Sequence, residues 1–304
     1  MLTPAPFYPG ARVALVAPAS PVPPERLSPA VEAVRALGLE PVVYPSCRPE
    51  HRRGYLAAPD PVRAGDIQAA FCDNSIAGVL CIRGGYGANR ILPLLDWAAI
   101  ARHPKVFAGY SDITALHIAL NQRCGLVTYH TIMPSTEYWE PVDPFSMGEL
   151  RRALFGGLTG VLPLPEGAVP VPLAPGRAEG VLCGGNLTLV CASLGTPWEI
   201  DTRGKLLFLE DIGEKPRRID AMLTQLRNAG KFADCAGVIL GAWTDCPEEE
   251  GDLPLEESFR ELILPAGKPV LAGVPCGHVL PTWSLPLGAR AVLDAGAGRL
   301  EVLS

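Results

Sequence analysis

Residues 106–122, VFAGYSDITALHIALNQ, join a short apolar strand to an amphipathic helix. Residues 106–109 have the composition of a buried strand, and the residues after Ser111 place apolar side chains at helical spacing. The same alternation of strand and helix recurs on both sides of this stretch, which is typical of a parallel sheet covered by helices on both faces. We therefore expect an α/β protein with a flavodoxin-like N-terminal domain, and chemistry at the carboxyl ends of its strands.

In the first half of the chain, short apolar runs that are bounded by Gly and Pro alternate with amphipathic stretches, and they predict the strands and helices. The expected strands are 12–17, 41–44, 78–82 and 106–109, and the expected helices are 25–37, 61–71, 89–95 and 112–122.

A Pro-rich stretch, residues 158–176, separates this pattern from a different one. Proline removes backbone donors and fixes φ, so the stretch suits extended edge segments or an interdomain linker. Beyond it we expect a smaller, mixed α/β domain with strands 205–209, 237–242, 269–273 and 289–294 and helices 187–194 and 217–229. The predicted organisation is an N-terminal domain 1–157, a linker 158–176 and a C-terminal domain 177–304.

Composition excludes several classes of protein. The chain of 304 residues is 48% hydrophobic and 19% charged, which is enough apolar material for two cores. Its net charge is −6 with scattered Lys and Arg, so no nucleic-acid partner is expected. No apolar run approaches the roughly 20 residues that span a bilayer, and the first residues lack a charged segment followed by an apolar one, so neither a membrane span nor a signal peptide is expected. The nine cysteines are odd in number and irregularly spaced, which favours free thiols in a reducing, cytoplasmic compartment.

Ser111 follows the apolar strand 106–109 in the sequence Gly-Tyr-Ser and begins the next helix. A serine at a strand-to-helix corner is lifted out of the sheet, beside backbone N–H groups that can stabilise an oxyanion. Ile113 stands where a G-x-S-x-G motif has its second glycine. The alternative is that Ser111 is only an N-cap.

A second motif, CIRGGYGANR at 81–90, also follows an apolar strand. Its glycines allow the main chain to approach a ligand and to expose N–H groups. The spacing fits neither a P-loop nor G-x-G-x-x-G, which disfavours a nucleotide site. An oxyanion or carboxylate cradle and a tight turn between strand and helix both remain open.

Two carboxylates, Glu210 and Asp211, end the apolar run LLFLED, and either of them suits the orientation of a histidine. Capping of the next helix or ion pairing is an equally open role. Of the five histidines, His278 lies in a loop framed by Gly and Pro after an apolar run, a setting suited to a general base. A serine, a carboxylate and a histidine together form the set that serine hydrolysis requires.

The chain resembles the LD-carboxypeptidase family, the S66 serine peptidases, which also include microcin-C immunity peptidases. The matching pieces cover most of the chain in the expected order and include VALVAPASP, RGGYGANRILP, GYSDITAL, EGVLCGGNLTLV, LFLEDIGEKPRRID and GHVLPTWSLPLGARAVLD.

This resemblance implies a serine carboxypeptidase that needs no metal or cofactor and that releases the terminal D-Ala of a murein tetrapeptide during peptidoglycan recycling. It implies Ser111 as nucleophile, His278 as general base and acid, and Glu210 rather than Asp211 as the group that orients the imidazole. It also implies Gly85 and the backbone N–H of Asp112 as oxyanion donors, and a homodimer.

Three further residues, Arg83, Gly84 and Trp283, are expected to contact the substrate, although packing is an equally open role for Arg83 and Trp283. The alternatives in function are a microcin-type peptidyl-nucleotide peptidase with the same triad, hydrolysis of related D-amino-acid peptides or acyl hydroxamates, and a non-catalytic protein that binds murein peptides.

Overall fold

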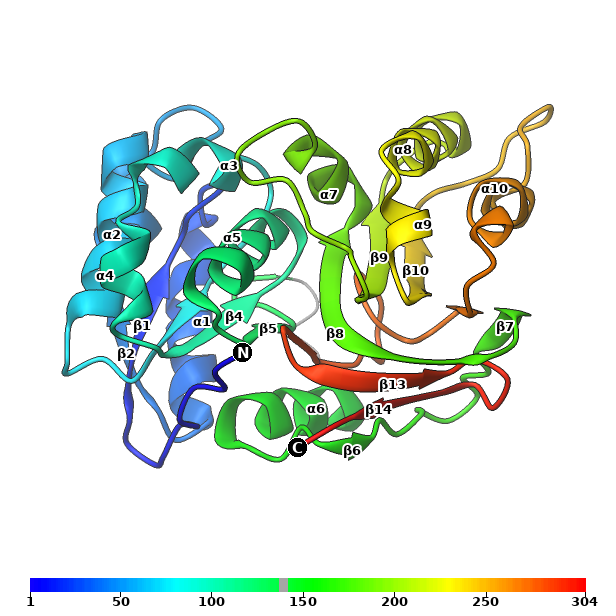
Figure 1. The fold of residues 1–304 in the computed structure, drawn as a ribbon. Helices are drawn as coiled ribbons and strands as arrows, with labels where there is room; N and C mark the ends of the chain where they lie inside the picture. The colour runs from blue at the N-terminus through cyan, green and yellow to red at the C-terminus, as the bar shows by residue number, and fades with distance from the viewer. Residues whose placement is uncertain (137–141) are drawn as a thin grey trace. The chain divides into compact units, whose positions relative to one another are not determined.

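The computed structural model describes residues 1–136 and 142–304, and the chain divides into two compact units. Unit 1 comprises Met1–Gly157 and Ser284–Pro286, and unit 2 comprises Leu158–Trp283 and Leu287–Ser304. Both are α/β units (Figure 1), which confirms the predicted fold class.

Unit 1 is built on a six-stranded sheet in the order β2-β1-β3-β4-β5-β12. Its strands are β1 (Arg12–Val16), β2 (Glu40–Val43), β3 (Gly78–Cys81), β4 (Val106–Gly109), β5 (Thr128–His130) and β12 (Leu285–Leu287). The pairs β1–β2, β1–β3, β3–β4 and β4–β5 are parallel. The order 2-1-3-4-5 is that of the flavodoxin-like fold. The sixth strand, β12, was not predicted and comes from near the end of the chain.

The helices of unit 1 are α1 (Pro24–Ala36), α2 (Asp60–Cys72), α3 (Ala88–Ile91), α4 (Trp97–Ala101), α5 (Thr114–Cys124) and α6 (Pro144–Phe155). Short 3₁₀ turns are η1 (Pro45–Cys47), η2 (Pro49–His51), η3 (Leu92–Leu94) and η4 (Ser111–Ile113). Three of the helices, α1, α2 and α5, begin and end within two residues of their predicted bounds. The helix predicted at 89–95 is instead divided into a short helix, α3, and a 3₁₀ turn, η3. In α5 the first seven residues are all buried, so this helix is part of the core rather than a half-exposed cover.

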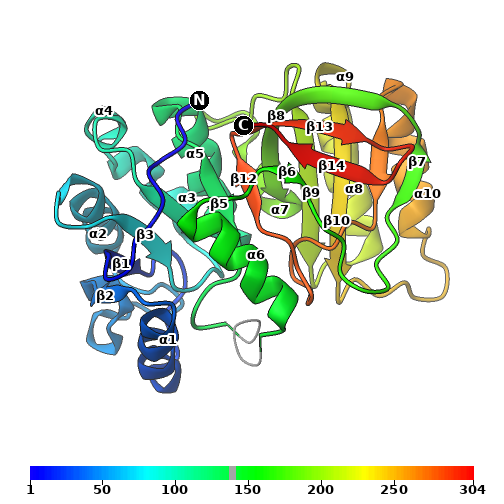
Figure 2. The same ribbon diagram turned by 90° about the horizontal axis from the view of Figure 1, so that it is seen from below.

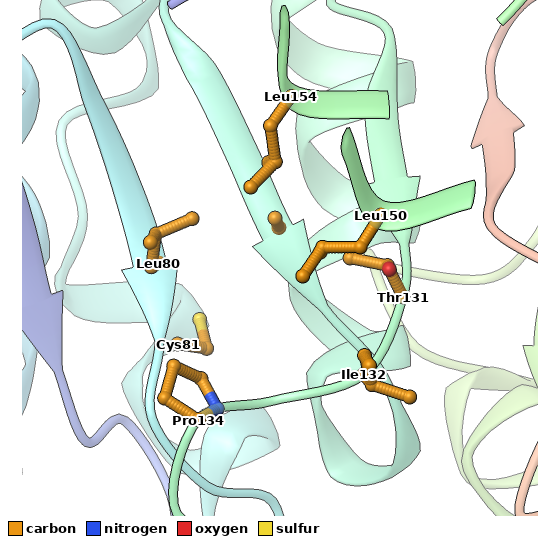
Figure 3. A pocket seen from close by; sticks show the side chains of 8 residues that line it. Leu80, Cys81, Thr131, Ile132, Pro134, Leu150 and Leu154 are labelled. Atoms are coloured by element: carbon orange, nitrogen blue, oxygen red, sulfur yellow. The ribbon is translucent and has the colours of Figure 1, made fainter. Parts of the chain in front are cut away.

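Helix α6 completes the apolar core next to β3 and β4. Leu150 and Leu154 point from α6 toward Leu80 of β3 across a small apolar pocket (Figure 3). The lining of this pocket is almost wholly apolar, as expected of a packing defect in a core rather than of a polar site.

Unit 2 contains an eight-stranded sheet in the order β6-β14-β13-β8-β9-β10-β11-β7. Its strands are β6 (Gly160–Val161), β7 (Val171–Ala174), β8 (Arg177–Asn186), β9 (Leu206–Ile212), β10 (Gly237–Thr244), β11 (Val270–Ala272), β13 (Arg290–Asp294) and β14 (Arg299–Val302). The pairs β8–β9, β9–β10 and β10–β11 are parallel, and the outer pairs are antiparallel. Figure 2 shows β13 and β14 running side by side.

The helices of unit 2 are α7 (Leu187–Ser193), α8 (Pro216–Asn228), α9 (Lys231–Asp234) and α10 (Leu255–Leu262), and η5 (Leu264–Ala266) is a 3₁₀ turn. The Pro-rich stretch belongs to this unit, because β6 and β7 are the two outermost strands of its sheet. Of the two roles left open for this stretch, an extended edge segment or an interdomain linker, the first is the one seen in β6 and β7. An edge strand tolerates proline because one side of its backbone needs no partner. No helix in the described part of the chain is long and apolar enough to cross a membrane.

Candidate active site

Ser111 lies at the turn between β4 and α5 with a left-handed backbone, φ 65°. Only one other non-glycine residue among those described, Asp245, has a positive φ. The side chain of Ser111 is partly exposed, whereas its neighbours Tyr110 and Asp112 are buried. Such strain at one exposed serine between a buried strand and a buried helix is the geometry of a nucleophile turn. Ser111 does not act as an N-cap, because neither η4 nor α5 has a side-chain cap.

His117, which sequence reasoning left unassigned, fixes the strand end that leads into Ser111. Its Nε2 lies 2.9 Å from the carbonyl oxygen of Gly109, and its Nδ1 lies 2.8 Å from Oγ1 of Thr128. A carbonyl can only accept, so Nε2 carries the proton and Nδ1 accepts from the threonine hydroxyl. Complete burial lowers the pKa of His117 to about 4, which keeps the ring neutral in this role.

Acid should therefore weaken the fold through His117. Because its pKa of about 4 lies below the ordinary value of 6.5, the unfolded chain takes up the proton first as pH falls. We expect the free energy of unfolding of the wild type, relative to His117→Gln, to decrease by about 1.4 kcal/mol per pH unit between pH 6.5 and pH 4. Urea unfolding of both proteins at several pH values measures this difference, and groups common to both cancel. A constant difference across this range would contradict a neutral, buried His117.

The glycine-rich loop after β3 lies directly against Ser111. A Cβ atom built on Gly84 would stand 2.9 Å from Cβ and 3.1 Å from Oγ of Ser111, so any larger residue there would displace the Ser111 side chain. The buried carboxylate of Asp112 accepts a 2.7 Å hydrogen bond from the backbone N–H of Ala88, and the N–H of Gly87 also donates to it. Burial raises the pKa of Asp112 to about 6, against the lowering effect of these donors. The side chain of Asp112 therefore ties the glycine-rich loop to the serine turn, a role that its sequence context did not reveal.

The two predicted oxyanion donors lie in this same region. Within residues 1–136 and 142–304, the backbone N–H groups of Gly85 and Asp112 donate no hydrogen bond. Gly85 is exposed and has φ 106°, and the side chain of Ser20 occupies the place that a Cβ atom there would take. Unit 1 thus presents a strained hydroxyl beside N–H groups that are available to a ligand, which are two of the parts that acyl transfer requires.

Gly84→Ala is expected to lower kcat about 100-fold, because a shift of the Ser111 side chain by a fraction of an ångström to one ångström has effects of that size. The fold should persist, since the clash is local. Gly65→Ala is the matched control, because it lies within α2 and a Cβ atom there has nothing within 4 Å. That variant should keep full activity and gain about 0.5–1 kcal/mol in stability. Equal kcat values for both variants, measured with thermal unfolding of each, would show that Gly84 does not position Ser111.

Unit 2 brings Glu210 and His278 together. Glu210 lies in the buried part of β9 and is 0% exposed, and its Oε2 lies 2.7 Å from Nδ1 of His278. The backbone N–H of His278 donates to the same oxygen at 3.3 Å, and Oγ1 of Thr244 donates to the His278 carbonyl. Since a carboxylate beside Nδ1 holds the proton on that nitrogen, Nε2 of the ring is left as an acceptor. Ser111 belongs to unit 1 and this pair to unit 2.

Two glycines allow the close packing around Glu210. A Cβ atom on Gly277, whose φ is 116°, would stand 2.6 Å from Oε2 of Glu210. A Cβ atom on Gly241 would stand 2.8 Å from the ring of Phe208 and 3.2 Å from Cβ of Glu210. The glycine before His278 is therefore a requirement of the carboxylate–imidazole contact, a reason for the Gly-framed loop that the sequence showed only as a pattern.

Asp211 has a different role from its neighbour. Its carboxylate accepts from the side-chain amide of Asn186 at 2.8 Å and from the N–H and hydroxyl of Thr188 at 3.0 and 2.9 Å. These contacts fix the start of α7 to β9. Successive side chains of a strand point to opposite faces, so Glu210 and Asp211 cannot both meet His278.

The remaining two predicted substrate contacts lie in different surroundings. Arg83 is partly exposed, and its Nη1 donates to the Pro21 carbonyl at 3.2 Å. Trp283 is 1% exposed, and its indole N–H donates to the carbonyl of Pro163 within unit 2. The packing role left open for Trp283 matches this contact, and a substrate role for either residue stays a prediction.

Comparison with known proteins places these features in one family. Residues 13–131 match the LD-carboxypeptidase N-terminal domain, and residues 179–293 match the LD-carboxypeptidase C-terminal domain. The chain belongs to the LD-carboxypeptidase family. This confirms the resemblance inferred from the sequence, and the family is one of peptidases.

Three similar proteins illustrate the range of the LD-carboxypeptidase family. A probable murein peptide carboxypeptidase of Bacillus subtilis is 41% identical over 94% of this chain and 89% of its own. The crystal structure of a muramoyltetrapeptide carboxypeptidase from Oxalobacter formigenes is 29% identical, with a TM-score of 0.85, and covers 96% of this chain and 99% of that one. The microcin C7 self-immunity protein MccF of Escherichia coli is 27% identical over 76% of this chain and 75% of its own.

Proposed function

We propose that this protein is a serine carboxypeptidase that hydrolyses the L,D-peptide bond of a murein tetrapeptide and so releases the terminal D-Ala in peptidoglycan recycling. The observation that carries the proposal is the 41% identity, over nearly the whole chain, to a protein named as a probable murein peptide carboxypeptidase. The strained Ser111 and the Glu210–His278 pair support a serine mechanism for it.

In the proposed reaction, Nε2 of His278 takes the proton of Ser111 while Oγ attacks the carbonyl carbon of the scissile bond. The N–H groups of Gly85 and Asp112 stabilise the oxyanion that forms. Collapse of the tetrahedral intermediate breaks the C–N bond, and His278 donates its proton to the amine of the departing D-Ala. A water molecule, activated in turn by His278, hydrolyses the acyl-enzyme and regenerates Ser111. Glu210 holds the imidazole in the required tautomer throughout.

A second candidate is a microcin-type peptidase acting on a peptidyl nucleotide with the same triad. The similarity to the microcin C7 self-immunity protein favours it, although the identity is lower and the shared length shorter than for the carboxypeptidase of Bacillus subtilis.

We also propose that the protein is cytoplasmic and forms a homodimer, with a small peptide as its substrate partner. All nine cysteines are free thiols, as expected in a reducing compartment, and seven of them are buried. Sedimentation of the purified protein tests the dimer.

Incubation with a murein tetrapeptide and with its all-L counterpart, followed by mass spectrometry of the released alanine, tests the substrate. Release of alanine from the L,D peptide alone supports the carboxypeptidase. Release from neither peptide, together with cleavage of an aminoacyl sulfamoyl nucleoside, would favour the microcin-type activity instead.

A further inference from the structure

An open pocket in unit 1 adjoins the serine turn but is not part of the proposed triad or oxyanion site. It is lined by residues 20–25, by Arg52 and Tyr55, and by Arg83. The backbone N–H of Ser20 donates to the carbonyl of Gly84 at 3.1 Å, and the hydroxyl of Ser20 accepts from the N–H of Tyr86 at 3.1 Å. Because Gly84 also lies against Ser111, the pocket is joined to the nucleophile through a single turn of backbone.

The charges around the pocket are available to a ligand. Within residues 1–136 and 142–304, none of Arg52, Arg83 and Glu25 forms an ion pair. Each guanidinium is held by one backbone carbonyl: Nε of Arg52 donates to Gly54 at 2.9 Å, and Nη1 of Arg83 donates to Pro21. Most of their donors are therefore unused, and an arginine fork matches the geometry of a carboxylate.

Sheet topology gives a second reason to expect a ligand here. The pocket residues follow β1, β2 and β3, whose carboxyl ends lie at one edge of the parallel sheet. In the order 2-1-3-4-5 the chain reverses direction across the sheet between β1 and β3, and ligands of such folds bind at that switch point. Figure 1 shows β1 and β2 in the same sheet as β4, which leads to Ser111, and in the strand order β3 lies between β1 and β4.

The spacing of the strands indicates which part of a peptide reaches the pocket. Neighbouring strands are about 4.8 Å apart, so the ends of β1 and β2 lie roughly 10–14 Å from the end of β4. The terminal carboxylate of a substrate lies one residue, at most ~3.6 Å, beyond the scissile carbonyl. The terminal carboxylate is therefore too close to the serine to reach the pocket. A charged group at the end of a long side chain can reach it.

We propose that Arg52 and Arg83 bind a side-chain carboxylate of the peptide substrate, and that Glu25 binds an ammonium group beside it, so that this pocket recognises a zwitterionic amino-acid head group on the acyl side of the scissile bond. The inference rests on the proposed peptidase function and names the specificity subsite of that activity. The D-centre of diaminopimelate carries such a head group, and lysine carries only the ammonium.

Four tetrapeptides ending in D-Ala test the pocket: one with diaminopimelate as third residue, one with its side-chain carboxylate amidated, one with lysine, and one with diaminopimelate and a C-terminal carboxamide. For the first, Arg52→Ala and Arg83→Ala should each lower kcat/KM about 10- to 100-fold, mainly through KM. For the amidated and lysine peptides the same variants should differ from the wild type less than threefold. Glu25→Gln should lower kcat/KM for all four peptides, because each of them carries the side-chain ammonium.

Arg102→Ala is the matched control, because Arg102 is an exposed arginine of unit 1 outside the pocket, and its removal should change no rate. Equal losses of kcat/KM for the two arginine variants on the first three peptides would overturn the inference. So would losses that disappear only with the C-terminal carboxamide, since the ligand would then be the terminal carboxylate. If the wild type releases D-Ala from none of the peptides, the proposed function itself fails, a result that differs from either of these.

Discussion

Ser111→Ala is expected to lower kcat/KM for a murein tetrapeptide by about 10⁴- to 10⁶-fold, because removal of the attacking oxygen leaves only binding and oxyanion stabilisation. The affinity for the peptide, measured by calorimetry on the variant, should change little. If the variant binds the peptide with the affinity of the wild type but no longer turns it over, the protein is an enzyme and not a protein that only binds murein peptides. Residual activity within tenfold of the wild type would exclude Ser111 as the nucleophile.

The backbone of Ser111 provides an independent test at the same position. Its φ of 65° strains any residue with a Cβ atom, so Ser111→Gly should be more stable than Ser111→Ala by about 1 kcal/mol. Thermal unfolding of the two inactive variants measures this difference. Equal stabilities would mean that the serine turn relaxes without cost, and the nucleophile would then not be held by strain.

Local sequence patterns were sufficient to predict the strand and the helix on either side of Ser111. Residues 106–109 form the predicted strand, and the residues after Ser111 form the predicted helix, because an apolar run followed by helical spacing specifies a βα unit wherever the sheet lies. The edge position of the Pro-rich stretch follows in the same way from the missing N–H groups of proline.

Contacts between distant residues were not predictable in this way. Strand β12 joins the sheet of unit 1 from more than 150 residues beyond β5, and next to it Oγ of Ser284 and Oγ1 of Thr131 lie 2.6 Å apart. The links from His117 to Gly109 and from Asp112 to Ala88 likewise depend on how the helix and the loop pack on the sheet. No pattern of neighbouring residues encodes these contacts, because each joins two segments that meet only in the folded chain.

Glu210→Gln is expected to lower kcat/KM about 10⁴-fold with little loss of stability. The amide keeps the shape of the carboxylate, but it no longer requires a proton on Nδ1 of His278, and the analogous change in another serine peptidase has an effect of that size. Peptide release and urea unfolding, measured on the same preparation, separate the two effects. Asp211 provides the matched control, because it is also a buried carboxylate but points to the other face of β9.

Asp211→Asn should give the reverse result. It weakens the charge-assisted hydrogen bonds to Asn186 and Thr188, so stability should fall by about 1–3 kcal/mol, while kcat stays within a few-fold of the wild type at temperatures where the protein is folded. If both variants lost activity alike, the alternation of β9 would not separate a catalytic face from a structural one. Opposite responses of two adjacent carboxylates would instead follow directly from the strand that presents them, because only one of its faces meets the imidazole.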